Sequence, residues 1–168
     1  MVVGFSQLVF VASIVKPELL TDQLKLKAIN YKLNKMNHQT ILPEGWPTPK
    51  GYSNGILAAK GRVLFLAGQV GWSPEEKFAS DKLIPQFEQA LKNIVSIVKK
   101  AGGKPEDICK MTCFCKDRKQ YLETRKELGA IWKNIMGKHY PCMSMIFVVD
   151  LLDHPALIEI EAMAVIPE

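Results

Sequence analysis

Apolar residues follow two different periods along the chain, and each period predicts a different kind of element. From Leu83 onward they recur every three or four residues, as in an amphipathic helix, and the same spacing returns over about 119–136. Gly-Gly at 102–103 ends the first of these segments, and Gly137 ends the second. Both segments are therefore expected to be helices.

Apolar runs without this spacing separate the helical segments and predict strands. They cover 56–59, 62–70, 108–115, 142–149 and 157–165. Lys60 and Gly61 divide the first two runs, a separation typical of a β-hairpin. The order β-β-α-β-α-β-β predicts an α+β fold with a single sheet and both helices on one face. Because the run at 63–67 is apolar on both sides, a second copy of the chain should cover the other face of the sheet.

The beginning of the chain differs in character from the rest. An apolar stretch over 2–15 is followed by an amphipathic stretch rich in lysine. No Lys or Arg precedes Lys16, so the basic start of a secretory signal is missing. We expect residues 1–35 to be an N-terminal extension, loosely ordered or an artefact of start-site choice, and residues 36–168 to form the functional domain.

Composition and charge narrow the possible partners. Hydrophobic residues make up 48% of the 168 and charged residues 23%, which is typical of a folded globular protein. No apolar run approaches the roughly 20 residues of a membrane span. The net charge is +5, of which residues 1–35 carry +3 and the remainder only +2. The remainder of the chain is therefore nearly balanced in charge, which argues against a nucleic acid as partner, and the short apolar runs argue against a membrane.

Cysteine and histidine are too scattered to predict a metal site. The cysteines are Cys109, Cys113, Cys115 and Cys142, and the histidines are His38, His139 and His154. No two cysteines form a C-x-x-C pair, and no His lies at a ligand spacing from them. We therefore expect no metal, and a reduced, cytoplasmic protein with small buried thiols.

Polar residues inside apolar strands are the best candidates for chemistry. Glu159 and Glu161 alternate with apolar residues, so on a strand both carboxylates point to the same face. Two carboxylates in one site would not ionise equally, and one of them would suit proton transfer. The alternative is a pair that faces solvent or pairs with Lys of a neighbour. Gln69, at the end of a strand, is a possible amide donor to a ligand.

Six segments, in the same order, resemble the RidA/YjgF family, also called endoribonuclease L-PSP. They are Gly-Tyr-Ser-Asn-Gly at 51–55, Phe-Leu-Ala-Gly-Gln at 65–69, Ala-Gly-Gly at 101–103, Phe-Cys-Lys-Asp at 114–117, Tyr-Pro-x-x-Ser at 140–144 and Ile-Glu-Ile-Glu-Ala at 158–162. The resemblance implies a chorismate-mutase-like α+β fold of the bacillus type and a barrel-like homotrimer with clefts between subunits. It also implies hydrolysis of reactive enamines and imines to a carbonyl product and ammonia, without a metal or organic cofactor.

The resemblance also implies roles for individual residues. Glu159 would be catalytic. The substrate-binding residues would be Tyr52, Gly68, Gln69, Arg125, Met143, Ser144 and Met145. Family members with deaminase activity carry an Arg where this chain has Met143, and that Arg clamps the substrate carboxylate. Arg125 either restores the cation from the helix side or runs along the helix flank to water, and the sequence favours the flank.

The expected function is therefore that of a RidA-like deaminase whose substrate preference is altered by Met143. An alternative is a non-catalytic small-ligand-binding or stress-related interaction protein of the same fold, which the missing Arg favours. Cleavage of RNA, suggested by the second family name, is less favoured. The body of the chain is nearly neutral and has no pair of histidines for that chemistry.

Overall fold

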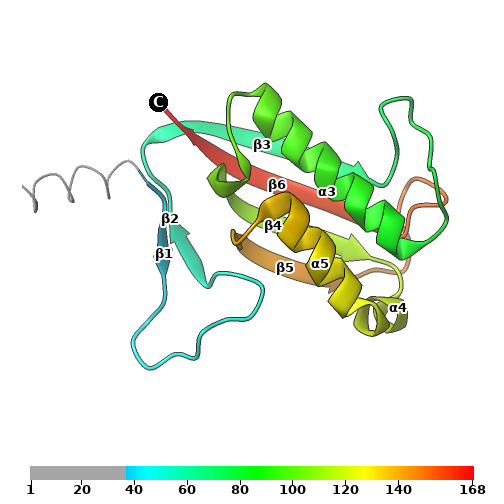
Figure 1. Ribbon diagram of the computed structural model, residues 1–168, viewed down its shortest axis with the longest axis horizontal. Coiled ribbons are helices and arrows are strands. Elements are labelled where there is room, and N and C mark those ends of the chain that lie inside the picture. Colours follow the sequence, from blue (N-terminus) through cyan, green and yellow to red (C-terminus); the bar gives the residue numbers. More distant parts are fainter. Residues whose placement is uncertain (1–36) are drawn as a thin grey trace, which may run out of the picture. The chain divides into compact units, whose positions relative to one another are not determined.

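The computed structural model describes residues 37–168, and the predicted extension 1–35 lies outside the described residues (Figure 1). Along the described chain the elements are β1 (Gln39–Ile41), β2 (Gly55–Leu57), β3 (Gly61–Val70), α3 (Leu83–Lys100), the 3₁₀ turn η2 (Pro105–Asp107), β4 (Ile108–Cys115), α4 (Arg118–Glu123), α5 (Arg125–Met136), β5 (Cys142–Phe147) and β6 (Ile158–Pro167). All five predicted strands are present, and β1 is an additional one.

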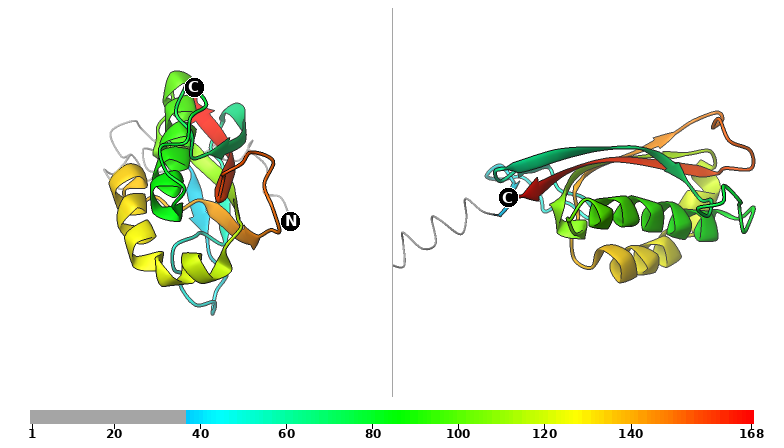
Figure 2. Two further views of the ribbon diagram at one scale, coloured as in Figure 1. Left: turned by 90° about the vertical axis from the view of Figure 1, so that its right-hand side faces the viewer. Right: turned by 90° about the horizontal axis from the view of Figure 1, so that it is seen from above.

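Four strands form the main sheet, in the order β3-β6-β4-β5. The pairs β3–β6 and β6–β4 are antiparallel, whereas β4 and β5 run parallel, so the sheet is mixed. Helices α3 and α5 lie side by side against the same face of this sheet (Figure 2). The predicted α+β class, with the helices on one face, is confirmed.

The predicted hairpin and the single sheet are wrong. β2 pairs with β1 in a separate two-stranded sheet, and β3 pairs with β6. A Cβ atom on Gly61 would lie 2.4 Å from the carbonyl oxygen of Ile166. The glycine is therefore needed for close approach of β3 to β6, whereas its position between two apolar runs suggested a turn.

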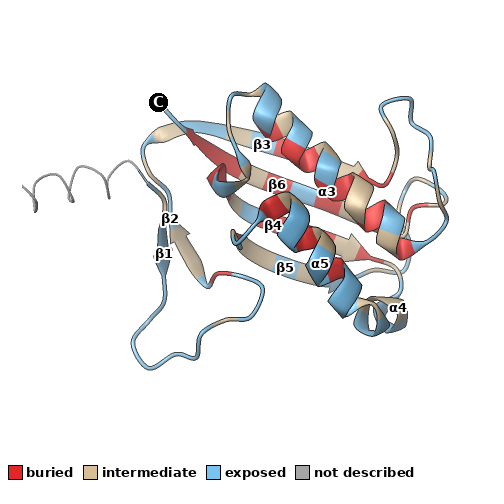
Figure 3. Cartoon of the chain, in the orientation of Figure 1, coloured by how far each residue is buried: buried red, intermediate tan, exposed pale blue. Residues whose placement is uncertain are grey.

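The core lies between the main sheet and the helices, as the buried stripe along α3 shows (Figure 3). This helix begins at Leu83 as predicted, and Gly102 follows its end with a φ of +87°. Leu91, Ile94 and Val98 are completely buried against the strands. The three- and four-residue spacing thus identified the face that packs on the sheet.

The second predicted helix, 119–136, is divided in two at Thr124. The backbone of Thr124 has φ −102° and ψ 10°, and its hydroxyl donates a hydrogen bond to the Gln120 carbonyl at 2.8 Å. Such a side-chain bond to the preceding turn interrupts regular helix. Arg125 consequently becomes the first residue of α5.

Gln86, buried within α3, fixes the segment that leads into β6. Its amide nitrogen donates to the carbonyls of Ser80 and Pro155, and its oxygen accepts from the Leu157 amide at 2.7 Å. All polar atoms of this buried side chain are therefore used in binding two loops to the helix. The first residues of β6, Glu159 among them, gain a fixed position.

Candidate active site

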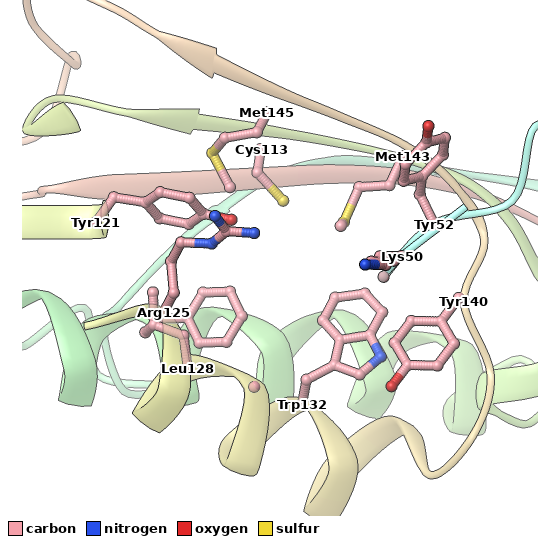
Figure 4. Close-up of a pocket in the computed structure, with 13 residues that line it drawn as sticks. Lys50, Tyr52, Cys113, Tyr121, Arg125, Leu128, Trp132, Tyr140, Met143 and Met145 are labelled. Carbon is pink, nitrogen blue, oxygen red and sulfur yellow. The ribbon is translucent and has the colours of Figure 1, made fainter. Parts of the chain in front are cut away.

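A cavity of about 430 Å³ lies between the sheet and helices α4 and α5 (Figure 4). It is lined by Lys50, Gly51, Tyr52, Phe87, Cys113, Tyr121, Arg125, Leu128, Gly129, Trp132, Tyr140, Met143 and Met145. Aromatic rings and sulfur atoms dominate this lining. Lys50 and Arg125 are its cations, and it contains no carboxylate.

Strand β5 supplies one wall of the cavity by simple alternation. Met143 and Met145 face the helices, and Cys113 of β4 lies in register with Met145. Ser144, between the two methionines, points to the other side of the sheet and is exposed. Of the three predicted binding residues on this strand, the two methionines therefore line the cavity and Ser144 does not.

Trp132 and Tyr140 form an aromatic wall opposite the strands. Their rings stack with centroids 6.0 Å apart and planes 3° from parallel. The Trp132 indole N–H donates to the His139 carbonyl at 3.0 Å, which holds the ring in one orientation. Ser53 donates through its hydroxyl to the Tyr140 carbonyl, and this bond places the neighbouring Tyr52 at the cavity.

Two ionisable groups in the wall, Cys113 and Tyr121, have raised pKa values. Burial, with a smaller contribution from Cys115, raises the pKa of the Cys113 thiol to about 12. Burial and the neighbouring Cys113 raise the pKa of Tyr121, although Arg125 acts in the opposite direction. Cys113 is therefore a thiol and not a nucleophilic thiolate. The Tyr121 hydroxyl keeps its proton and is available as a hydrogen-bond donor.

Arg125 reaches the cavity from the beginning of α5. Its guanidinium lies toward Tyr121 and the β5 wall in Figure 4, although the side chain also keeps considerable exposure. Within residues 37–168, Arg125 makes no ion pair. Of the two placements that the sequence left open, the structure has the one in which Arg125 reaches the cavity.

Glu159 lies on the opposite face of the sheet. Ile158 and Ile160 are buried on the helix side, so Glu159 and Glu161 point away from the helices. A Cβ atom on Gly68 would lie 1.7 Å from Oε1 of Glu159, so the carboxylate occupies the space that this glycine leaves free.

Burial raises the pKa of Glu159 above its ordinary value, and the charges of Asp153 and Glu161 raise it further. Gln69, beside Gly68, donates from its side-chain amide to the Gly68 carbonyl at 3.1 Å. Glu159 and Gly68 therefore lie together, Gln69 is opposite Ile160 in the register, and none of the three lines the cavity.

The predicted site residues are therefore divided between two places. Tyr52, Arg125, Met143 and Met145 line the cavity, whereas Glu159, Gly68, Gln69 and Ser144 lie outside it. Tyr121 and Trp132 also line the cavity, and both lie within the segment 119–136 that was predicted to be helical. Helical spacing of apolar residues does not distinguish a packed core from a cavity wall.

No three side chains of the His, Cys, Asp or Glu type come together as a metal site within residues 37–168. No helix within these residues is both long enough and apolar enough to cross a bilayer.

A mixed sheet covered by helices on one face, with a cavity of small-molecule size beneath them, defines an α+β protein. The model of the Endoribonuclease L-PSP family matches residues 46–166, and the chain belongs to this family.

Individual relatives agree with this assignment. The chain is 30% identical over 131 residues to the 2-iminobutanoate/2-iminopropanoate deaminase of Salmonella typhimurium, covering 76% of this chain and 97% of the relative. It is 31% identical over 128 residues to a RutC family protein of Pyrococcus horikoshii, covering 75% and 96%. Among solved structures, the Rid family protein YyfB of Yersinia pestis superposes with a TM-score of 0.70 at 28% identity, covering 78% of this chain and 100% of that one.

Proposed function

We propose that this protein hydrolyses small reactive imines and enamines to a carbonyl product and ammonia. The observation that carries the proposal is the carboxylate of Glu159, seated over Gly68 with a raised pKa, in a chain 30% identical to an iminobutanoate deaminase. A carboxylate with a raised pKa holds a transferred proton more readily than an ordinary glutamate, which suits it to general acid–base catalysis.

In the proposed reaction, Glu159 takes a proton from water as the water oxygen bonds to the carbon of the C=N group. Glu159 then gives this proton to the nitrogen, which yields a tetrahedral carbinolamine and returns Glu159 to its ionised form. The C–N bond then breaks, the hydroxyl proton passes by way of Glu159 to the departing nitrogen, and ammonia and a carbonyl remain. An enamine enters the same sequence after tautomerising to its imine.

Two copies of the chain are needed for this chemistry, because Glu159 and the cavity lie on opposite faces of one sheet. We propose a homotrimer in which Glu159 of one copy meets Tyr52 and the cavity of its neighbour. Exposed apolar side chains on the face of Glu159 support this, since Val63 is 53% exposed and Phe65 74%. Residues 36–168 would form this unit, in line with the family match that begins at residue 46.

The four cysteines are all free, which supports a reducing, cytoplasmic location.

Met143 would change the substrate preference, because a thioether cannot bind the carboxylate that an arginine would clamp at this position.

A non-catalytic ligand-binding role is the second candidate. The observation in its favour is the cavity itself, which is lined without any acidic side chain to move a proton. Under this alternative the cavity binds its ligand, and Glu159 serves only in contacts between copies.

The test is ammonia release from imines that an amino-acid oxidase generates in the assay. The protein should accelerate release above the buffer rate, and Glu159→Gln should lower that rate at least about a hundredfold, as expected when a general acid–base group is removed. Glu161→Gln, on the same face of the same strand, is the matched control and should retain activity. If the wild-type protein releases ammonia no faster than buffer but still binds ligand, the deaminase function is wrong and the ligand-binding role is favoured.

A further inference from the structure

We infer that Arg125 anchors the carboxylate of the substrate, and that the preferred substrates are imines of carboxylic acids that carry an aromatic or similarly large apolar group. The inference rests on the proposed function and specifies the ligand of its cavity. It transfers the anion site from the sheet wall, where Met143 lies, to the helix wall.

The first argument is that the cation of Arg125 has no partner of its own. No carboxylate lines the cavity, and within the described residues Arg125 makes no ion pair. A guanidinium directed into an apolar cavity without a counter-charge is available to a ligand carboxylate, which it can bind through two parallel hydrogen bonds.

The second argument is the position of Tyr121 beside Arg125 (Figure 4). Because its pKa is raised, the Tyr121 hydroxyl keeps its proton and can donate to the same carboxylate. A cation and a neutral donor then converge at one end of the cavity. Met143 lies on the sheet wall farther along, so the apolar part of the ligand would extend toward it.

The third argument is the size and composition of the remaining walls. At about 430 Å³ the cavity belongs to the range of sites for ligands of drug size, well above the needs of a three-carbon imino acid. Trp132 and Tyr52 present aromatic surface, and Met143 and Met145 are flexible and polarisable. Such walls favour a ring through stacking and sulfur–aromatic contact.

Lys50 has a secondary role. It lines the cavity near Tyr52, away from the guanidinium of Arg125 in Figure 4. Its ammonium raises the positive potential of the opening without the planar fork that binds a carboxylate in two places. Replacing Lys50 should therefore weaken binding less than replacing Arg125.

Titration calorimetry with stable 2-oxo acids separates these features from turnover. Phenylpyruvate should bind about tenfold more tightly than pyruvate, which lacks the ring, and than phenylacetone, which lacks the carboxylate. Arg125→Gln should weaken phenylpyruvate binding about tenfold, the equivalent of one charge-assisted hydrogen bond. Lys126→Gln, which removes the same charge from the next residue of α5, should leave binding unchanged.

Ammonia release from the imines of phenylalanine and alanine gives the second readout. A higher rate for the phenylalanine imine, together with a loss of rate for both imines in Arg125→Gln that Arg125→Lys partly restores, supports the inference. If both imines react at equal rates and Arg125→Gln has the rate of the wild type, the inference about Arg125 is wrong, but the proposed deaminase function stands. Arg125-dependent phenylpyruvate binding without any ammonia release supports the anchor and overturns the proposed function instead.

Discussion

The two faces of the main sheet carry different chemistry. The face under the helices has an aromatic cavity with two cations and no acid. The other face has the carboxylates of Glu159 and Glu161 among exposed apolar side chains. Because successive residues of a strand point to opposite faces, no adjustment of side chains within one copy can bring the two sets together.

The cavity and the face of Glu159 differ in whether they can be completed by one chain. The cavity is built from contacts within one chain, such as the Trp132 stack on Tyr140 and the Ser53 bond to the Tyr140 carbonyl. The face of Glu159 keeps large apolar groups exposed, Phe65 above all. We therefore expect ligand binding to be a property of each chain, and turnover to be a property of the assembly.

The largest expected effect comes from breaking the assembly. Phe65→Glu places a charge on the face of Glu159, where it would be desolvated between copies. The variant should elute as a monomer, and ammonia release should fall at least about a hundredfold because the two half-sites no longer meet. Light scattering after gel filtration measures the mass.

Leu122→Glu, on α4, is the control for this change, since Leu122 is also an exposed apolar residue but lies on the helix side. It should remain assembled and active. A fully active trimer of Phe65→Glu would show that the two faces do not cooperate through this surface.

Gly68→Ala should have the next largest effect. The added Cβ would occupy the position of the Glu159 carboxylate, which must move away. The rate should fall about a hundredfold, as for loss of a general base. Stability should change by less than about 1 kcal/mol, because the displaced atoms are the end of a flexible side chain.

The double variant Gly68→Ala/Glu159→Gln provides the control. If the glycine acts only through the carboxylate, the double variant should be no slower than Glu159→Gln alone. Additive losses would assign Gly68 a separate role, and thermal unfolding checks that each variant folds.

The smallest effect concerns pH. Glu159 must be ionised to accept a proton, and burial together with Asp153 and Glu161 raises its pKa. The acidic limb of kcat/KM should therefore lie above the ordinary glutamate value. Asp153→Asn removes one cause of the rise, so the midpoint should move to lower pH.

Asp150→Asn is the matched change in the same loop. Asp150 pairs with Lys116 at 2.5 Å and does not contribute to the shift of Glu159. The acidic limb of kcat/KM for Asp150→Asn should coincide with that of the wild type. If the midpoint of the acidic limb moves to higher pH in Asp153→Asn, or by the same amount in both variants, the pH dependence of kcat/KM does not report the ionisation of Glu159.

Sequence reasoning succeeded where neighbouring residues carry the information. Helix α3 begins at Leu83 and ends before Gly102, and strand β4 occupies 108–115, all as predicted. It failed where contacts between distant segments determine which strands pair. Gly61 was interpreted as a turn although it serves the approach of β3 to β6, and β2 pairs with a strand that the apolar pattern did not reveal.

The sequence by itself determined the α+β class, the inner faces of the helices and the identity of the polar residues within the strands. Only the tertiary structure decided that Arg125 shares a cavity with Met143, and that Glu159 lies across the sheet from both. Helix and strand periods arise from hydrogen bonds and side-chain directions within a few residues. Which walls face each other depends instead on the packing of segments far apart in the chain, and no local pattern records it.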